Sequence, residues 1–333
     1  MPTYKSKSLL AIAAFLAAAL AGCSAPATAP PTAAPGDAAA ITTTAGTWPR
    51  TITHAGQEVT IAAAPARIVA LSTETGDMAL ELVGHGRVAA VSNGSVTTGA
   101  GNQLEEAVQV ETSLPSSVTP DPEQILALNP DLVLMTSRHE GEKDAAAILS
   151  ASGVPSMVFE SADFENLENV MSALTTLGIA LGAEDKAASI TGKMIQDRDR
   201  VLASLAKNQD SPTVLLLMQR GGKQFIQAKS SAMSTLAAQA GGTIVGAAQA
   251  ATAVDAELII KANPDVILVE DFHGAGIAPF KKLLSQEVLA NTPAIANGRV
   301  ATVSAAIASG TAGTHLVEGL STIAAVLNPD AKG

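Results

Sequence analysis

The sequence has few aromatic residues, a single cysteine and fewer basic than acidic residues. Phe, Trp and Tyr make up 2% of its 333 residues, so the core must rest on aliphatic side chains and a ligand site has few rings for stacking. The 20 basic residues are outnumbered by 31 acidic ones, which gives a net charge of −11. This balance argues against nucleic acid as a partner and against a polybasic membrane contact, because both interactions need a basic surface.

The single cysteine lies where a targeting segment would end. Lys5 and Lys7 precede an unbroken apolar run over 9–21, and Leu-Ala-Gly then leads to Cys23. The run is too short for a membrane-spanning helix, which needs ~20 residues, but it has the pattern of a secretory signal. Its end resembles a bacterial lipobox, which implies that 1–22 is a lipoprotein signal peptide and that Cys23 carries the lipid. The alternative is an ordinary signal peptide that contains a cysteine.

The residues after the cysteine have the composition of a tether. Residues 23–46 are almost entirely Ala, Pro, Thr, Ser and Gly. Such a segment cannot bury a core, so we expect a disordered stalk. A lipid anchor followed by a stalk places the rest of the chain on the outer face of the cytoplasmic membrane, whether extracellular or periplasmic.

Two segments of the remaining chain resemble each other. Each has a short helix pattern, an Asn-Pro stop and a run of branched apolar residues, over 121–135 and 255–269. Proline just past a helix end cannot continue the helix, and such an apolar run is typical of a buried parallel strand. Strand and helix patterns alternate on both sides of these segments, which indicates βαβ units. The duplication therefore predicts two similar α/β lobes, over 47–163 and 208–333.

A helical pattern separates the two predicted lobes. Apolar residues keep helical spacing from Leu167 to Leu181, and beyond Gly182 the pattern continues to Leu205 with charges on one side. We interpret 164–207 as a largely helical connector. At 1.5 Å per residue, even ~20 helical residues would span ~30 Å, which is enough to brace both lobes.

This order of segments resembles the class III substrate-binding proteins of ABC importers, which bind iron chelates, haem and cobalamin. The resemblance covers about 65–329 and is carried by the strand pattern at 65–72, by Glu-Gln-Ile-Leu-Ala-Leu-Asn-Pro-Asp-Leu-Val at 123–133, and by the segments 240–242 and 292–300. It implies an α/β fold of two Rossmann-like lobes joined by a long connecting helix, with the ligand cleft between the lobes. It also implies a monomeric, non-enzymatic lipoprotein that delivers an iron chelate to a permease.

The resemblance further implies a docking device for the permease. Members of the family present one glutamate from each lobe to arginines of the permease, and Glu123 and Glu257 occupy the matching positions of the two repeats. Two matched acidic points can steer and orient an encounter. The alternative is that both are first-turn glutamates stabilised by the helix dipole.

In open α/β lobes, ligands bind at the carboxyl ends of the strands. The loops after the predicted strands, which include 72–75 and 92–93, also carry basic and imidazole side chains. These are Arg138, His139, Arg220, Lys223 and His273. The Arg-Gly-Gly sequence at Arg220 resembles the haem-binding branch, where each lobe supplies an axial His or Tyr, and this implies His139 as a haem-iron ligand. The second lobe has no tyrosine, so His273 would have to substitute.

Several ligands remain open at this point. The cationic side chains Arg138, Arg220 and Lys223 would suit an anionic ferric siderophore, whereas cobalamin fits poorly with so few aromatics. A bare zinc or manganese ion is an alternative, although the five histidines form no close pair. A secreted hydrolase is the alternative from another class, but the chain has neither a Gly-x-Ser-x-Gly elbow nor a His-Glu-x-x-His sequence.

Overall fold

The structure is a computed structural model that describes residues 46–115, 119–205 and 211–329. These residues belong to one compact unit. The expected signal peptide over 1–22, the lipidated Cys23 and nearly all of the stalk over 23–46 lie outside the described residues. No helix in the described ranges is long and apolar enough to cross a membrane.

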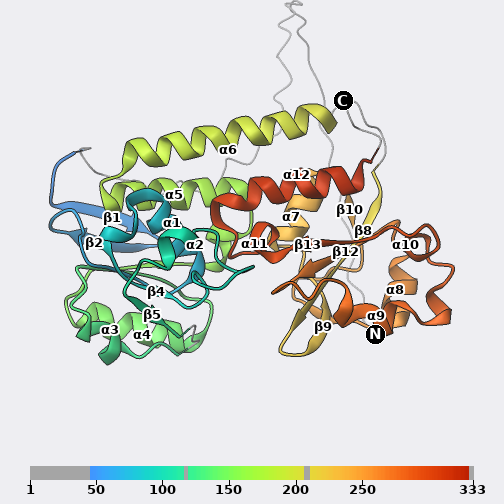
Figure 1. Cartoon of the computed structure of the whole chain (residues 1–333), viewed down its shortest axis with the longest axis horizontal. Coiled ribbons are helices and arrows are strands. Elements are labelled where there is room, and N and C mark those ends of the chain that lie inside the picture. The colour runs from blue at the N-terminus through green and yellow to red at the C-terminus, as the bar shows by residue number, and fades with distance from the viewer. Residues whose placement is uncertain (1–45, 116–118, 206–210, 330–333) are drawn as a thin grey trace, which may run out of the picture. The chain divides into compact units, whose positions relative to one another are not determined.

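The first lobe is a parallel sheet covered by helices (Figure 1). Its strand order is β5-β4-β3-β6-β7. The strands are β3 (Ile68–Ala70), β4 (Val88–Ser92), β5 (Thr112–Leu114), β6 (Leu132–Thr136) and β7 (Ser156–Phe159). The helices are α1 (Thr73–Val83), α2 (Leu104–Ala107), α3 (Pro122–Ala127) and α4 (Glu140–Ala151). The central strands β3 and β6 are completely buried, as expected for strands with helices on both faces of their sheet.

A hairpin precedes this lobe and ties it to the helices that follow it. The hairpin consists of β1 (Arg50–His54) and β2 (Gln57–Ile61), which pair antiparallel. Arg50 is 3% exposed, lies 2.7 Å from the Glu184 carboxylate and donates a hydrogen bond to the Ile179 carbonyl. Because a buried guanidinium needs such partners, these contacts fix the hairpin against the helical region.

The second lobe repeats the parallel core and adds a hairpin. Its strand order is β11-β9-β8-β12-β13, with β10 also paired to β8. The strands are β8 (Thr213–Arg220), β9 (Lys223–Ile226), β10 (Thr243–Ile244), β11 (Thr252–Ala253), β12 (Val266–Asp271) and β13 (Val300–Ser304). The helices are α7 (Ala232–Gln239), α8 (Ala256–Ala262), α9 (Lys281–Leu284), α10 (Pro293–Ala296), α11 (Ala305–Ala308) and α12 (Leu316–Leu327). Strands β8, β12 and β13 are parallel, and β9 and β11 pair antiparallel.

The duplicated segments have the same local structure in both lobes. The side chains of Asp121 and Asp255 accept hydrogen bonds from backbone N–H groups at the starts of α3 and α8, as N-cap residues do. After each helix, Asn129 (φ 49°) and Asn263 (φ 44°) adopt the left-handed conformation, which asparagine tolerates better than most residues. The Asn-Pro sequence therefore ends each helix and turns the chain into the next strand.

The aspartate after each Asn-Pro sequence joins two neighbouring strands. Asp131 accepts hydrogen bonds from the backbone N–H groups of Ala66 (2.7 Å) and Arg67 (2.9 Å), just before β3. Asp265 accepts one from the Thr213 N–H (2.9 Å) at the start of β8. These contacts hold β6 beside β3 and β12 beside β8, and the prediction of two similar α/β lobes is confirmed.

The connector consists of two helices, α5 (Leu167–Leu181) and α6 (Glu184–Leu205). Gly182 (φ 67°) ends α5, and the chain reverses so that α6 packs against α5. At Gly178, an added Cβ would lie 2.5 Å from the Ala187 Cβ, so glycine allows this close approach. The helix α6 also packs against α12 of the second lobe, and Figure 1 shows it running along both lobes. The predicted connecting helix is therefore α6, while α5 packs against the first lobe.

Candidate ligand-binding cleft

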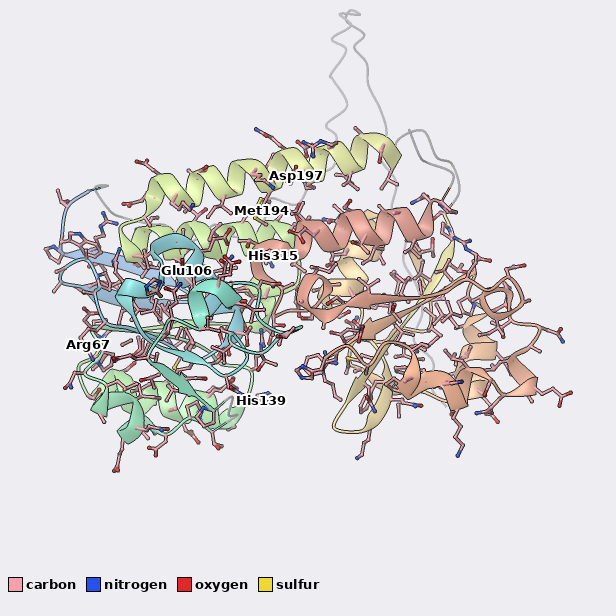
Figure 2. All side chains as sticks on the ribbon, in the orientation of Figure 1. Arg67, Glu106, His139, Met194, Asp197 and His315 are labelled. Carbon is pink, nitrogen blue, oxygen red and sulfur yellow. The ribbon has the colours of Figure 1, made fainter. Side chains whose placement is uncertain are left out.

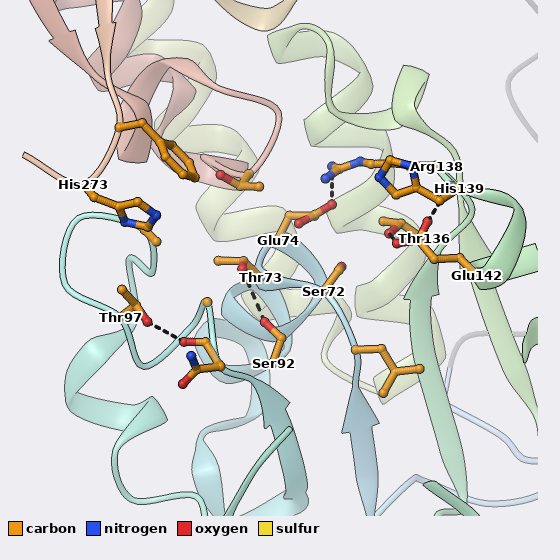
Figure 3. Close-up of a pocket in the computed structure, with 16 residues that line it drawn as sticks. Ser72, Thr73, Glu74, Ser92, Thr97, Thr136, Arg138, His139, Glu142 and His273 are labelled. Carbon is orange, nitrogen blue, oxygen red and sulfur yellow. Dashed lines mark hydrogen bonds and ion pairs between the residues drawn. The ribbon is translucent and has the colours of Figure 1, made fainter. Parts of the chain in front are cut away.

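A cavity of about 410 Å³ lies where the two lobes meet (Figure 3). This volume is within the ~300–1,000 Å³ typical of small-molecule sites. The first lobe supplies residues at and after the ends of β3, β4 and β6, and the second lobe supplies residues that follow β12 and α11. The lining residues are Leu71, Ser72, Thr73, Glu74, Ser92, Asn93, Gly94, Thr97, Ala100, Thr136, Arg138, His139, Glu142, Phe272, His273 and Thr311.

The topology of the first lobe explains the position of the cavity. Strand β3 lies between β4 and β6, so the chain leaves β3 toward one edge of the sheet and later returns on its other side. A crevice forms at the carboxyl ends of the strands where the connections diverge in this way. Glycine at position 94 allows the chain after β4 to pack closely against Thr73, because an added Cβ there would lie 1.9 Å from the Thr73 hydroxyl.

A buried ion pair forms one wall of the cavity. Glu74, in the first turn of α1, is 0% exposed, and the Arg138 guanidinium donates a hydrogen bond to its carboxylate. Burial raises the pKa of Glu74, and the charge of Arg138 opposes this effect. Arg138 also donates to the Gly310 carbonyl of the second lobe at 3.3 Å. The pair therefore connects the first lobe to the second as well as lining the cavity.

His139 is exposed at the edge of the first lobe that faces the second (Figure 2). It precedes α4, and its backbone N–H donates a hydrogen bond to the Glu142 carboxylate at 2.9 Å. The other oxygen of Glu142 accepts a hydrogen bond from the Thr136 hydroxyl at 3.4 Å. Glu142 thus fixes the loop that presents His139, and it adds a second carboxylate to the cavity wall.

Phe272, His273 and Thr311 form the wall from the second lobe, and Arg220 packs against Phe272. The Arg220 guanidinium donates to both carboxylate oxygens of Glu270, at 2.8 and 2.9 Å, and lies 4.5 Å from the ring centroid of Phe272. The rings of Phe272 and His273 are 3.9 Å apart. His273 has a φ of 61°, a strained value for a residue other than glycine. Figure 3 shows its ring across the cavity from His139 and Arg138.

The candidate residues from the sequence separate into two groups. Arg138, His139 and His273 line the cavity, whereas Arg220 and Lys223 do not. Strand β8 continues to Arg220, and Gly221 and Gly222, both with positive φ, make a two-residue turn into β9. The expected loop is therefore a hairpin, and the Gly-Gly pair between strand-forming residues was a usable signal for it.

Some lining residues were not singled out from the sequence. Glu142, Thr97 and Thr311 belong to segments that do not directly follow a predicted strand, so the strand-end rule does not find them. The two glutamates proposed for docking lie elsewhere. Glu123 and Glu257 are exposed in the first turns of α3 and α8, which are equivalent positions of the two lobes.

The histidines do not form a site for a bare metal ion in the part of the chain that the structure describes. No group of three or more His, Cys, Asp or Glu side chains there could hold a metal. His54, His85 and His315 each lie beside a carboxylate outside the cavity. The donor set of the described residues therefore gives no support to the zinc or manganese alternative.

Solved structures share this fold across most of the chain. A periplasmic heme-binding protein, RhuT, from Roseiflexus sp. RS-1 is 22% identical with a TM-score of 0.64, over 80% of this chain and 99% of that one. A periplasmic heme-binding protein from Pseudomonas aeruginosa is 24% identical with a TM-score of 0.66, over 80% and 94%. The siderophore-binding protein BauB, bound to acinetobactin and ferric iron, is 22% identical with a TM-score of 0.64, over 83% and 99%.

Sequence comparison gives the family. Among curated protein sequences, none matches this one. Residues 68–306, which include the parallel-stranded sheets of both lobes and the connecting helices, match the family model described as periplasmic binding protein. The chain belongs to the periplasmic binding protein family.

Proposed function

We propose that this chain is an extracytoplasmic lipoprotein that captures an iron chelate, either a ferric siderophore or haem, and delivers it to an ABC permease. The observation that carries the proposal is the cavity of about 410 Å³ at the strand ends, with walls from both lobes. The heme-binding and siderophore-binding proteins of the same fold support the choice of iron chelates. We expect the ligand to be released unchanged, because family members are binding proteins.

Each kind of chelate has side chains in its favour. For haem, His139 and His273 come from opposite walls of the cavity, and imidazole is a common axial ligand of haem iron. For a siderophore, the hydroxyl and amide side chains of the first lobe can bind the oxygen-rich surface of a chelate. These side chains are Ser72, Thr73, Ser92, Asn93, Thr97 and Thr136.

The first test is a titration of the purified full-length chain with haemin, followed by absorbance, in parallel with calorimetric titrations of ferric siderophores. If haem is the ligand, the Soret band shifts sharply at one equivalent, and His139→Ala weakens the shift. His85→Ala is the matched control, because this histidine lies outside the cavity. If siderophores are the ligands, heat is released only with them. A chain that binds neither haemin nor any ferric siderophore refutes the proposed function.

A further inference from the structure

The charged groups of the cavity do not make it positive. Among the described residues that line it, Arg138 is the only Lys or Arg, and Glu74 and Glu142 are the carboxylic acids. With the histidines counted as neutral, the formal charge is negative when both glutamates are ionised. If the buried Glu74 is protonated, Glu142 still balances Arg138. The cavity is therefore neutral or negative in either state.

Arg138 is also not available to pair with an anionic ligand. It is hydrogen bonded to the Glu74 carboxylate and to the Gly310 carbonyl. An anion that took this guanidinium would leave the fully buried carboxylate of Glu74 without its counter-ion, and breaking a buried pair in this way is strongly unfavourable. The guanidinium is thus a structural partner of α1 and of the second lobe.

The two other cationic residues that the sequence suggested for the site do not change the balance. Both Glu270 carboxylate oxygens accept hydrogen bonds from Arg220, and Glu270 is only 3% exposed in its side chain. Lys223 is exposed on the hairpin and does not line the cavity. Each arginine is therefore hydrogen bonded to a buried glutamate of its own lobe.

Seven of the other lining residues carry uncharged hydroxyl or amide groups, among apolar side chains such as Leu71 and Phe272. Hydroxyl and amide groups can donate hydrogen bonds to the carbonyl and N–O oxygens of a chelate without requiring it to carry charge. From this balance we infer that the cavity selects ferric chelates without net negative charge, of the trihydroxamate type, over anionic tricatecholates and over haem with its propionates. This inference rests on the proposed function and specifies its ligand class.

The test compares four probes on the full-length chain at pH 8. The probes are ferrioxamine B, a cationic ferric trihydroxamate; ferrichrome, a neutral one; ferric enterobactin, an anionic tricatecholate; and haemin. Calorimetry should give the lowest Kd for one of the two trihydroxamates. The anionic probes should bind at least about tenfold more weakly, which corresponds to a like-charge repulsion of ~1.4 kcal/mol or more in a partly dehydrated site.

Two substitutions in α4 separate the charge of the cavity from the charge of the whole protein. Glu142→Gln removes a carboxylate that lines the cavity, keeps an oxygen for the His139 N–H and offers an NH2 that can donate to the Thr136 hydroxyl. It should weaken ferrioxamine B roughly fivefold and strengthen the anionic probes, with smaller effects at high salt. Glu140→Gln makes the same change at an exposed position of the same helix outside the cavity, and should leave every Kd within about twofold.

The outcomes distinguish this inference from the proposed function. Tighter binding of ferric enterobactin or haemin than of both trihydroxamates would overturn the charge selection and leave the iron-chelate function intact. An equal effect of Glu142→Gln on cationic and anionic probes would overturn it too. Binding of none of the four probes would overturn this inference, and the wider titrations with ferric siderophores would then decide the iron-chelate function.

Discussion

Asp77 of α1 is a buried carboxyl group that ties a loop of the first lobe to the second lobe. It is 5% exposed, and one of its oxygens accepts a hydrogen bond from the Asn102 backbone N–H at 2.6 Å. The Asn102 side chain donates in turn to the carbonyls of Ala306 (2.8 Å) and Ala312 (3.2 Å) in the second lobe. The other oxygen of Asp77 is buried as well.

Burial raises the pKa of Asp77 from 3.8 to about 7. Hydrogen bonds from Asn102 and Ser95 oppose this increase, and the nearby carboxyls of Glu74 and Glu81 add to it. The folded state therefore binds a proton that the unfolded state releases between about pH 4 and pH 7. The contribution of protonated Asp77 to the unfolding free energy is therefore complete below pH 4 and is lost as the pH rises through 7. A difference of about three pH units at ~1.4 kcal/mol each corresponds to roughly 4 kcal/mol of unfolding free energy.

The substitution Asp77→Asn removes this titration and keeps an oxygen for the Asn102 N–H. We expect the unfolding free energy of the variant, relative to the natural chain, to increase by roughly 4 kcal/mol between pH 4 and pH 8. The new amide adds an offset of ~1–3 kcal/mol where it lacks an acceptor, but this offset does not depend on pH. Urea unfolding followed by circular dichroism at each pH gives the difference. Parallel curves for the two proteins would refute the reasoning, since the titrating group would then be elsewhere.

Three further predictions concern packing, pairing and docking. An added Cβ at Gly319 would lie 2.0 Å from the carbonyl oxygen of Ile307, so Gly319→Ala should lower the unfolding free energy by ~1–3 kcal/mol in urea titrations. An unchanged midpoint of unfolding would contradict this close approach. Arg220→Leu should lower the unfolding free energy by roughly 2–3 kcal/mol, because it leaves the buried Glu270 carboxylate unpaired; the cost is below that of a fully buried pair because the arginine is 39% exposed. A double variant with Glu270→Leu should recover most of this loss, and a double variant that recovers none would argue against the pair. Glu123→Arg with Glu257→Arg should leave chelate binding intact and abolish uptake by cells; normal uptake in this variant would rule out the docking role.

Local signals in the sequence were sufficient to predict the two lobes. The Asn-Pro stops and the buried strands after them depend on backbone constraints and burial that recur unchanged in both repeats. Asn129 and Asn263 adopt the same left-handed conformation, and Asp131 and Asp265 cap the neighbouring strand in the same way. A pattern that determines its own local structure can be recognised without knowledge of distant contacts.

The partners of the arginines could not be predicted in this way. We expected the cationic loop residues to face the ligand because each of them follows a predicted strand. The structure pairs Arg138 with a residue 64 positions away and Arg220 with one 50 positions away. Such pairing depends on how the strands are ordered in the sheet, which periodicity does not reveal. The same limitation applies to Thr97 and Thr311, which reach the cavity from segments distant in sequence.

The two lobes arrange their ion pairs in opposite ways. In the first lobe the glutamate follows the first strand, β3, and the arginine follows β6; in the second lobe the arginine ends the first strand, β8, and the glutamate lies in β12. In both, a buried carboxylate from one strand end neutralises a guanidinium from its neighbour, as a charge in a poorly hydrated site requires. The strand ends are thereby held together without leaving an unpaired arginine in the cavity. Selection among ligands then depends on Glu142, the histidines and the uncharged hydroxyl and amide groups. Varying the charge of the chelate is therefore the sharpest test of how this cleft binds its ligand.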